Sequence, residues 1–184
     1  LSKYDAIPVD SAIAKQKPFD EVKEISMEYP VSESEPEEEN SYLSYNIVTG
    51  DSLDVEQSTA FEILDYTLLS AAGAPLKQAL LDAGMGKDIM GSYEDGIYQP
   101  FFSIVAKNAR PENKDAFVKL IRDTLSEIVE KGIDRKAIAA GINYLEFRFR
   151  EADYSSFPKG LMYGIDVFDS WLYDENKPFI HLRA

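Results

Sequence analysis

The sequence of 184 residues contains no cysteine and a single histidine, His181. The lack of cysteine excludes a disulfide framework, thiolate metal sites and a cysteine nucleophile. One histidine excludes any zinc site built on two or more imidazoles of this chain. A Ser-His-Asp triad would have to use His181, three residues from the last position. We expect such a terminal histidine to face solvent or to contact a further segment rather than to act as a general base.

Basic residues and long apolar runs are also scarce. Lys and Arg number 19 against 33 Asp and Glu, which gives a formal net charge of −14 at pH 7. Neutralising phosphates needs clustered Lys and Arg, so we expect no nucleic-acid partner. No apolar run approaches the roughly 18–20 residues of a membrane span, and no signal-peptide pattern is present at the start. We therefore expect no membrane partner and a cytoplasmic location, or an organelle matrix if the source is eukaryotic.

Common catalytic and nucleotide-binding motifs are missing as well. The sequence has no G-x-x-x-x-G-K-[ST] loop, no G-x-G-x-x-G fingerprint and no G-x-S-x-G elbow. Glu94 and Asp95 could in principle form an acid–base pair, but adjacent residues on a strand point to opposite faces. No catalytic residue and no metal ligand are predicted in this chain.

The residues that are present predict a folded domain, since 45% are hydrophobic and 12% aromatic. The chain begins at Leu1 rather than Met, and we expect it to be a fragment of a longer polypeptide. Residues 1–19 are predicted to form a helix end and an extended lead-in, with two prolines and no sustained period. Residues 20–153 are predicted to form the domain, and residues 154–184 a terminal helix and the start of a linker.

Two segments with a period of two predict half-buried strands. The first is Lys23–Val31, in which Ile25, Met27, Tyr29 and Val31 share one face. The second places Leu43, Tyr45 and Ile47 opposite Tyr42, Ser44 and Asn46. Between them, Ser32–Asn40 holds five glutamates around Pro36 but lacks the Asp/Asn spacing and the glycine of an EF-hand loop. We interpret it as a solvated hairpin tip that folding does not require.

From Asp51 onward the period of 3.6 predicts helices. Ser52 or Asp54 can cap the first, and Pro75 begins a second that ends near Gly84. Strands are predicted at Ile89–Glu94 and Pro100–Lys107, joined through Asp95-Gly96. Three more helices are predicted. The first is Glu112–Lys131, and the second is capped by Asp134 and has Ile138, Leu145 and Phe149 on its apolar face. The third follows Pro158 and has Leu161, Ile165, Phe168 and Leu172 on one face. Trp171 and Tyr173 are expected to dock this last helix onto a neighbour.

The resulting order, β-β-α-α-β-β-α-α-α, predicts an α+β fold. We expect a two-layer sandwich in which a largely antiparallel sheet carries its helices on one face. The apolar side of the first two strands is predicted to pack against those helices (Ile25, Met27, Leu43, Tyr45 and Ile47).

Several longer motifs resemble one family. Four of them are similar to segments of the inner, non-catalytic domain of pitrilysin/insulinase-type zinc peptidases. They are Ala74–Gly86, Tyr93–Gly96, Gln99–Ile104 and Asn143–Phe147. The run Phe157–Gly164, continuing into Asp169–Asp174, is the most specific of these motifs and resembles the presequence-protease subfamily. The resemblance extends from about Leu43 to Leu182.

The resemblance implies a parent zinc endopeptidase that encloses unfolded peptides in a chamber of two halves. Its metal ligands come from an inverted H-x-x-E-H helix and a distal Glu in the first domain, which a chain with one histidine cannot contain. This chain would then be the second domain of the N-terminal half, inactive alone and without a cofactor, with zinc in the missing catalytic domain. Its partners would be the other domains of the same chain and unfolded peptide.

Another class of function remains open: a stand-alone binding or assembly subunit of the same fold that acts with a separate peptidase chain. An H-x-x-E-H motif within about one domain upstream would favour the peptidase-domain hypothesis.

The resemblance also implies that the sheet face opposite the helices lines the chamber. The predicted substrate-facing residues are Tyr42, Ser44, Asn46, Gln99, Phe101 and Ser103. The alternative is that this face is only solvated. The negative net charge would attract basic peptides, and salt should weaken that attraction.

Overall fold

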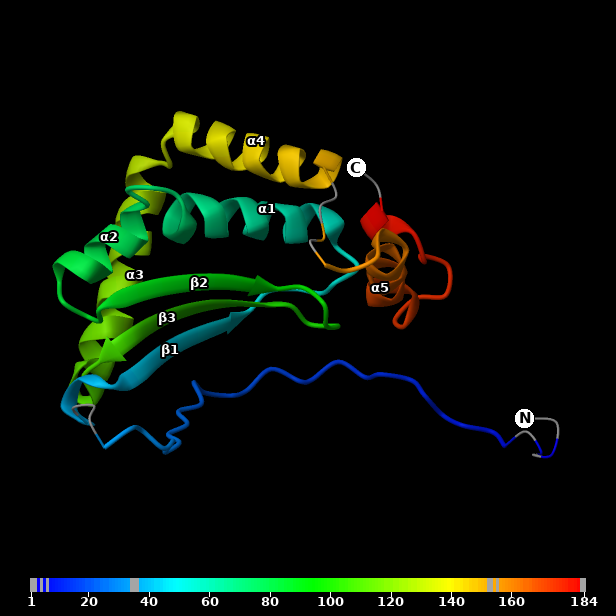
Figure 1. Cartoon of the computed structure of the whole chain (residues 1–184), viewed down its shortest axis with the longest axis horizontal. Coiled ribbons are helices and arrows are strands. Elements are labelled where there is room, and N and C mark those ends of the chain that lie inside the picture. Colours follow the sequence, from blue (N-terminus) through cyan, green and yellow to red (C-terminus); the bar gives the residue numbers. More distant parts are fainter. Residues whose placement is uncertain are drawn as a thin grey trace.

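The computed structural model describes residues 3, 5, 7–33, 37–151, 154 and 156–182. Figure 1 shows a small sheet with helices α1 and α4 stacked above it and α5 at one end. A long extended segment from the N-terminal side passes below the sheet on the side of strand β1. Among the described residues, no helix is long and apolar enough to cross a membrane.

The sheet has three strands, β1 (Ser41–Val48), β2 (Asp88–Glu94) and β3 (Phe101–Ala109). Their order is β1-β3-β2, and both pairs are antiparallel. The predicted hairpin between β2 and β3 is therefore confirmed. A bulge lies near the end of β3, where the register shifts and Asn108 adopts a φ of 52°.

In the described residues, five α-helices lie on one side of the sheet or at its end: α1 (Val55–Asp65), α2 (Pro75–Asp82), α3 (Lys114–Lys131), α4 (Arg135–Glu151) and α5 (Lys159–Trp171). Asp54 caps α1, because its Oδ1 accepts a hydrogen bond from the Gln57 N–H at 2.9 Å. Asp134 accepts one from the Lys136 N–H at 3.0 Å. Both caps were predicted and are confirmed.

Three short 3-10 turns complete the described part: η1 (Glu37–Glu39), η3 (Pro111–Asn113) and η4 (Ile180–Leu182). Helix α1 continues into a π-helical segment, η2 (Tyr66–Ser70), which packs closely on β2. A Cβ on Gly91 would lie 2.4 Å from both Asp65 Oδ1 and Leu69 Cδ1. Glycine at this position therefore permits the close approach of the π-helical segment to the sheet.

The core lies between the sheet and the helices. It is built from buried side chains of all three strands and of η2, α2 and α3, including Leu43, Leu69, Leu76, Leu80, Ile89, Ile104, Phe117 and Ile121. Removing these apolar side chains from water stabilises the arrangement. The structure thus confirms the predicted α+β sandwich with helices on one face.

The first predicted strand is wrong. Within the described residues the chain forms no strand before Ser41, and Ile25 and Met27 are 83% and 84% exposed rather than packed against helices. The segment touches the body through an ion pair from Glu24 to Lys114 Nζ at 2.7 Å and a ring contact between Tyr29 and Tyr42. Alternation predicts which faces a strand would have, but a strand also needs hydrogen bonds from a neighbouring edge. Ile47, expected on the helix-covered side, is 38% exposed at the outer strand β1.

The acidic segment also differs from the prediction at one residue. Residues 34–36 lie outside the described part, but Glu39 forms ion pairs with Lys87 Nζ at 3.0 Å and Arg110 at 2.8 Å. Hydrogen bonds from Arg110 and Lys87 lower the pKa of Glu39 to about 2. The segment therefore contacts the folded body, and its interpretation as a wholly solvated tip is wrong.

Helices α4 and α5 turn unexpected side chains outward. Phe149, predicted on the apolar face of α4, is 52% exposed, whereas Gly141 and Leu145 are buried. Tyr173 stacks on Tyr98 with ring centroids 4.3 Å apart and ties the end of α5 to the β2–β3 loop, as predicted. Trp171 does not dock in this way, because half of its surface is exposed.

Candidate functional site

The sheet face that points away from the helices is the candidate site, and we refer to it as the open face. Because side chains alternate along a strand, every second residue of each strand points to this side, and the strand register places these residues next to one another. They are Ser44, Asn46 and Val48 from β1, Phe101, Ser103 and Val105 from β3, and Met90, Ser92 and Glu94 from β2.

A polar group lies at the centre of the open face. The Asn46 side-chain oxygen Oδ1 accepts hydrogen bonds from the Ser103 hydroxyl across the strands and from the Ser44 hydroxyl at 3.1 Å. Ser103 is only 6% exposed because it lies on the central strand, whereas Ser44 and Asn46 are exposed. The neighbouring strand thereby orients the amide of Asn46.

Apolar side chains flank this polar group. Val48 is 60% exposed and Met90 is 40% exposed, and Phe101 is half-buried beside Val48. Glu94 adds an exposed carboxylate at the end of β2. The open face can therefore offer an extended polypeptide apolar contacts, hydrogen bonds and one negative charge.

The structure brings together four of the six predicted substrate-facing residues: Ser44, Asn46, Phe101 and Ser103. Tyr42 lies at the far end of β1, near the bulge, and its ring meets that of Tyr29 edge-on with centroids 5.8 Å apart. The sequence interpretation missed Val48, Met90, Ser92 and Glu94. The alternation within Asp88–Glu94 could have found the last three once the pairing with β3 was known.

Gln99, the sixth predicted residue, lies in the loop before β3 and binds an extended stretch of this same chain. Its Oε1 accepts a hydrogen bond from the Gln16 N–H at 2.5 Å, and its Nε2 donates one to the Gln16 carbonyl at 3.1 Å. Lys15 next to it pairs with Asp51 at 2.5 Å and lies over the Tyr98 ring. One side-chain amide thus satisfies both main-chain groups of an extended residue.

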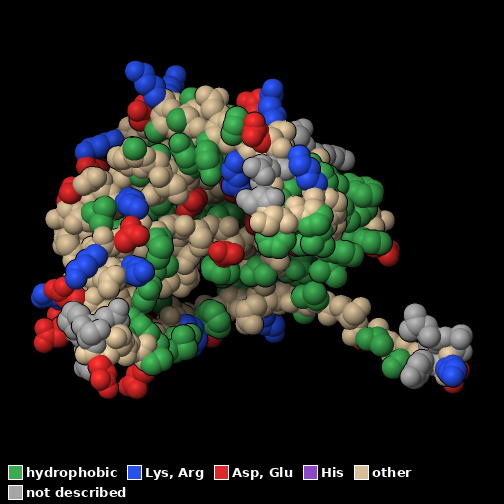
Figure 2. All heavy atoms as spheres, viewed as in Figure 1, with side chains coloured by type: hydrophobic (Ala, Val, Ile, Leu, Met, Phe, Trp, Pro, Cys, Tyr) green, Lys and Arg blue, Asp and Glu red, His purple; other side chains and the backbone are tan. Residues whose placement is uncertain are grey.

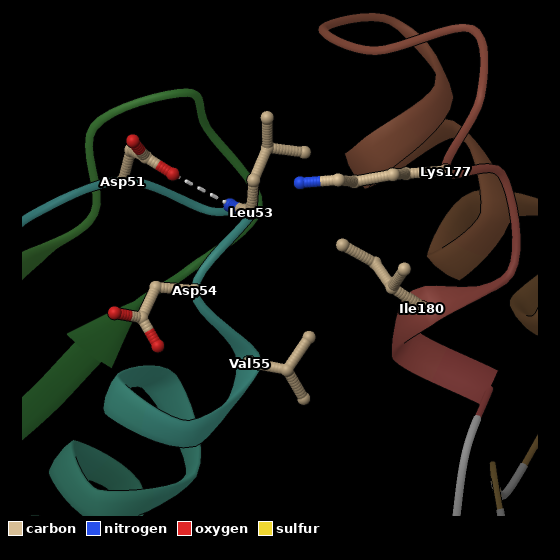
Figure 3. A pocket seen from close by; sticks show the side chains of 6 residues that line it. All are labelled: Asp51, Leu53, Asp54, Val55, Lys177 and Ile180. Carbon is tan, nitrogen blue, oxygen red and sulfur yellow. Dashed lines mark hydrogen bonds between the residues drawn. The ribbon is translucent and has the colours of Figure 1, made fainter.

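The other candidate site is a pocket of about 530 Å³ between the start of α1 and the segment around Lys177 (Figure 3). Its two carboxylates already have structural partners. Asp51 accepts a hydrogen bond from the Leu53 N–H at 2.9 Å and one from Lys15, which lowers its pKa, while Asp54 caps α1. Ligand binding in this pocket would compete with these contacts, so the open face remains the stronger candidate.

A group of carboxyl side chains faces the space between α1, α5 and the β2–β3 loop. Burial raises the pKa of Glu62 to about 7, with Asp95 adding to the shift and Arg148 opposing it. Burial also raises the pKa values of Asp166 and Asp169, and His181 opposes both shifts. His181 is half-buried and its Nε2 is shielded from solvent, so of its two expected environments the solvent-facing one is wrong, and contact with a further segment stays a prediction. These residues come from separate elements, which no local sequence pattern connects.

The described part of the chain contains no group of three His, Cys, Asp or Glu side chains arranged to hold a metal ion. The described side chains therefore do not form a zinc site, and no chemical step is assigned to a metal here.

Comparison with known proteins places this fold in a family. The sequence model of the Peptidase M16 inactive domain matches residues 2–145. The chain belongs to this family. The predicted resemblance to a non-catalytic domain of pitrilysin/insulinase-type peptidases is thereby confirmed.

The curated relatives of this chain include two that match its whole length. It is 44% identical over 183 residues to "Protein HypA" of Clostridium perfringens and 33% identical over 187 residues to "Presequence protease 1, chloroplastic/mitochondrial" of Arabidopsis thaliana. These alignments cover 19% and 17% of the relatives, so the chain spans about a fifth of their length or less.

One solved structure supports the fold. A protein of Bordetella pertussis Tohama I with a provisional zinc-protease name superposes with a TM-score of 0.58 over 78% of this chain and 79% of that one. The sequence identity is 9%, so this likeness concerns the fold alone.

Proposed function

We propose that this chain is a non-catalytic, chamber-forming domain of a zinc-dependent endopeptidase that degrades unfolded peptides. The observation that carries the proposal is the open face, a sheet surface with polar and apolar side chains and no helix cover among the described residues, in a member of the Peptidase M16 inactive domain family. The presequence-protease name of a relative that is 33% identical supports the substrate class.

The open face suits peptides of varied sequence. Hydroxyl and amide groups can bind any main chain, and Val48, Met90 and Phe101 contact apolar side chains without requiring one sequence. The contact between Gln99 and Gln16 supports this role, because it shows a side chain near this face binding an extended main chain. The net charge of −14 attracts basic peptides, and salt screens that attraction.

In this proposal the zinc ion is held by another domain of the same, longer polypeptide, and this chain binds and orients the peptide. The partners are those other domains and the unfolded peptide. The location is the cytoplasm, or an organelle matrix in a eukaryote. A separate assembly subunit with the same fold is the alternative, but the relatives, which are five or more times longer, favour a domain of one polypeptide.

The test is the double substitution Tyr42→Ala and Phe101→Ala in the complete polypeptide, which removes the ring of Phe101 from the open face and that of Tyr42 from the far end of the same strand surface, near the bulge. Loss of two aromatic contacts, each about 0.5–1.5 kcal/mol, should raise KM for long peptides roughly fivefold or more and leave KM for short peptides nearly unchanged. Zinc content and thermal stability are measured in parallel. Val129→Ala, an exposed apolar residue on α3, is the control. Equal effects on long and short peptides, or none, would reject the role of the open face.

A further inference from the structure

Helix α5 exposes its apolar stripe. Leu161, Ile165, Phe168 and Leu172 recur at the spacing of one helical face, and they are 53%, 43%, 51% and 58% exposed. In a helix that packs on its own domain, such a stripe faces the core and the polar side faces water. In α5 the orientation is reversed.

The opposite face of α5 confirms this reversal. Ser170 is fully buried, and Asp166 and Asp169 are half-buried toward the rest of the domain. Tyr173, just beyond the helix, stacks on Tyr98 and holds the helix end in this orientation. Helix α5 therefore does not lie loosely on the domain, because its polar side is anchored there while its apolar stripe points outward.

The exposed stripe continues at both ends into aromatic side chains. Phe157 precedes the helix with 62% of its surface exposed, and Trp171 stacks on Phe168 with ring centroids 6.0 Å apart. Figure 2 shows hydrophobic side chains gathered over α5, in contrast to the mixed surface elsewhere in that view. We refer to Phe157, Leu161, Ile165, Phe168, Trp171 and Leu172 as the α5 patch.

The α5 patch is large for a surface exposed to solvent. Aromatic side chains have roughly 150–250 Å² of surface, so three of them and three aliphatic side chains at about half exposure leave at most on the order of 600 Å² accessible. This area is at the upper end of the roughly 300–600 Å² of the largest apolar patch on a monomer, a size that is often functional, and it is below the roughly 800 Å² that each partner of a stable interface buries.

We propose that another domain of the same polypeptide, outside the 184 residues, packs an apolar surface against the α5 patch. This inference rests on the proposed function for its premise that the complete polypeptide is longer than these 184 residues. The curated relatives support that premise, because this chain aligns with only about a fifth of their length or less. A second copy fits less well, because two chains of net charge −14 repel each other. The α5 patch is then an internal joint of the complete protein and not a binding surface for peptide.

The test uses the absence of cysteine from this chain. Leu161→Cys and Ile165→Cys are introduced singly into the complete polypeptide, and maleimide labelling of each is followed by peptide-resolved mass spectrometry. Val129→Cys is the matched control, since Val129 is also apolar, also helical and 82% exposed. Each rate is divided by the rate in the unfolded protein, which removes differences in intrinsic thiol reactivity.

Both α5 positions should be labelled at least about tenfold more slowly than position 129, independently of protein concentration. The exposed fractions of the three sites in this chain differ by less than twofold, so they cannot produce that ratio. Rates within about twofold of the control would overturn the proposal. Protection that disappears on roughly hundredfold dilution, together with a falling mass by light scattering, would also overturn it in favour of a second copy. Labelling needs no peptidase activity, so this result is independent of the test of the proposed function.

Discussion

The hydroxyl of Ser103 on β3 donates a hydrogen bond to the side-chain oxygen of Asn46, the residue directly opposite on β1. The bond crosses the open face and links a buried serine to an exposed amide. It ties an exposed part of the candidate site to the central strand.

This pairing predicts coupling between the two residues. Asn46→Ala should destabilise the protein by about 1–3 kcal/mol, because the nearly buried Ser103 hydroxyl loses its acceptor. Ser103→Ala combined with Asn46→Ala should cost less than the sum of the two single substitutions. Urea unfolding of the three variants measures the difference, and Ser44→Ala, which alters only an exposed donor, is the control. Strict additivity would show that the hydrogen bond contributes nothing.

Helix α3 has one buried and one solvent-facing side, which predicts different costs of truncation. Ile121 is fully buried, so Ile121→Ala should lower the free energy of unfolding by about 2–5 kcal/mol. Leu120 and Ile128 are only partly buried, so their truncation to alanine should cost less. Lys119→Ala, on the exposed side, should change it by less than about 0.5 kcal/mol. Denaturant unfolding of these variants measures the free-energy changes. Equal losses of stability from substitutions on the two sides of the helix would contradict the packing of α3.

The ion pairs of Glu39 predict a loss of stability in acid. Hydrogen bonds from Arg110 and Lys87 lower the pKa of Glu39 from 4.5 to about 2 in the folded protein. Its contribution is therefore complete above pH 4.5 and is lost as the pH falls toward 2. Glu39→Gln should flatten this part of the stability curve, measured as urea midpoints between neutral and acidic pH. Its exposed neighbour provides the control Glu38→Gln, and identical curves for both variants would contradict the role of Glu39.

The buried carboxyl of Glu62 predicts the opposite dependence of stability on pH. Burial raises its pKa from 4.5 to about 7, so the folded state keeps a proton that the unfolded state releases. The free energy of unfolding should fall as the pH rises from 4.5 to 7 and stay low above that range. Glu62→Gln should remove the fall and stabilise the protein at alkaline pH by no more than about 3 kcal/mol.

Thermal melts at acidic and alkaline pH measure the effect of Glu62→Gln. Glu56→Gln, an exposed position on the same helix, is the control and should leave the fall in place. A Glu62→Gln variant that keeps the wild-type pH profile would show that the carboxyl is better solvated than its position indicates.

The sequence alone predicted the elements whose signals are local. Asp54 at the start of α1, Pro75 at the start of α2 and Asp134 before α4 are chemical markers that act within one turn of chain. The alternation of Tyr42, Ser44 and Asn46 likewise predicted the side of β1 that faces away from the helices. Four of the proposed site residues came from such alternation and lie together in the structure.

Tertiary structure decided what depends on distant partners. The alternation in Lys23–Val31 could not show that no edge in the described part of the chain pairs with it, and the sequence around Glu39 gave no sign of its contacts with Lys87 and Arg110. The stripe of α5 was visible as a period, but a period shows only that one face is apolar. Which surface covers that face depends on contacts far along the chain, because burial is a property of the packed molecule and not of the segment.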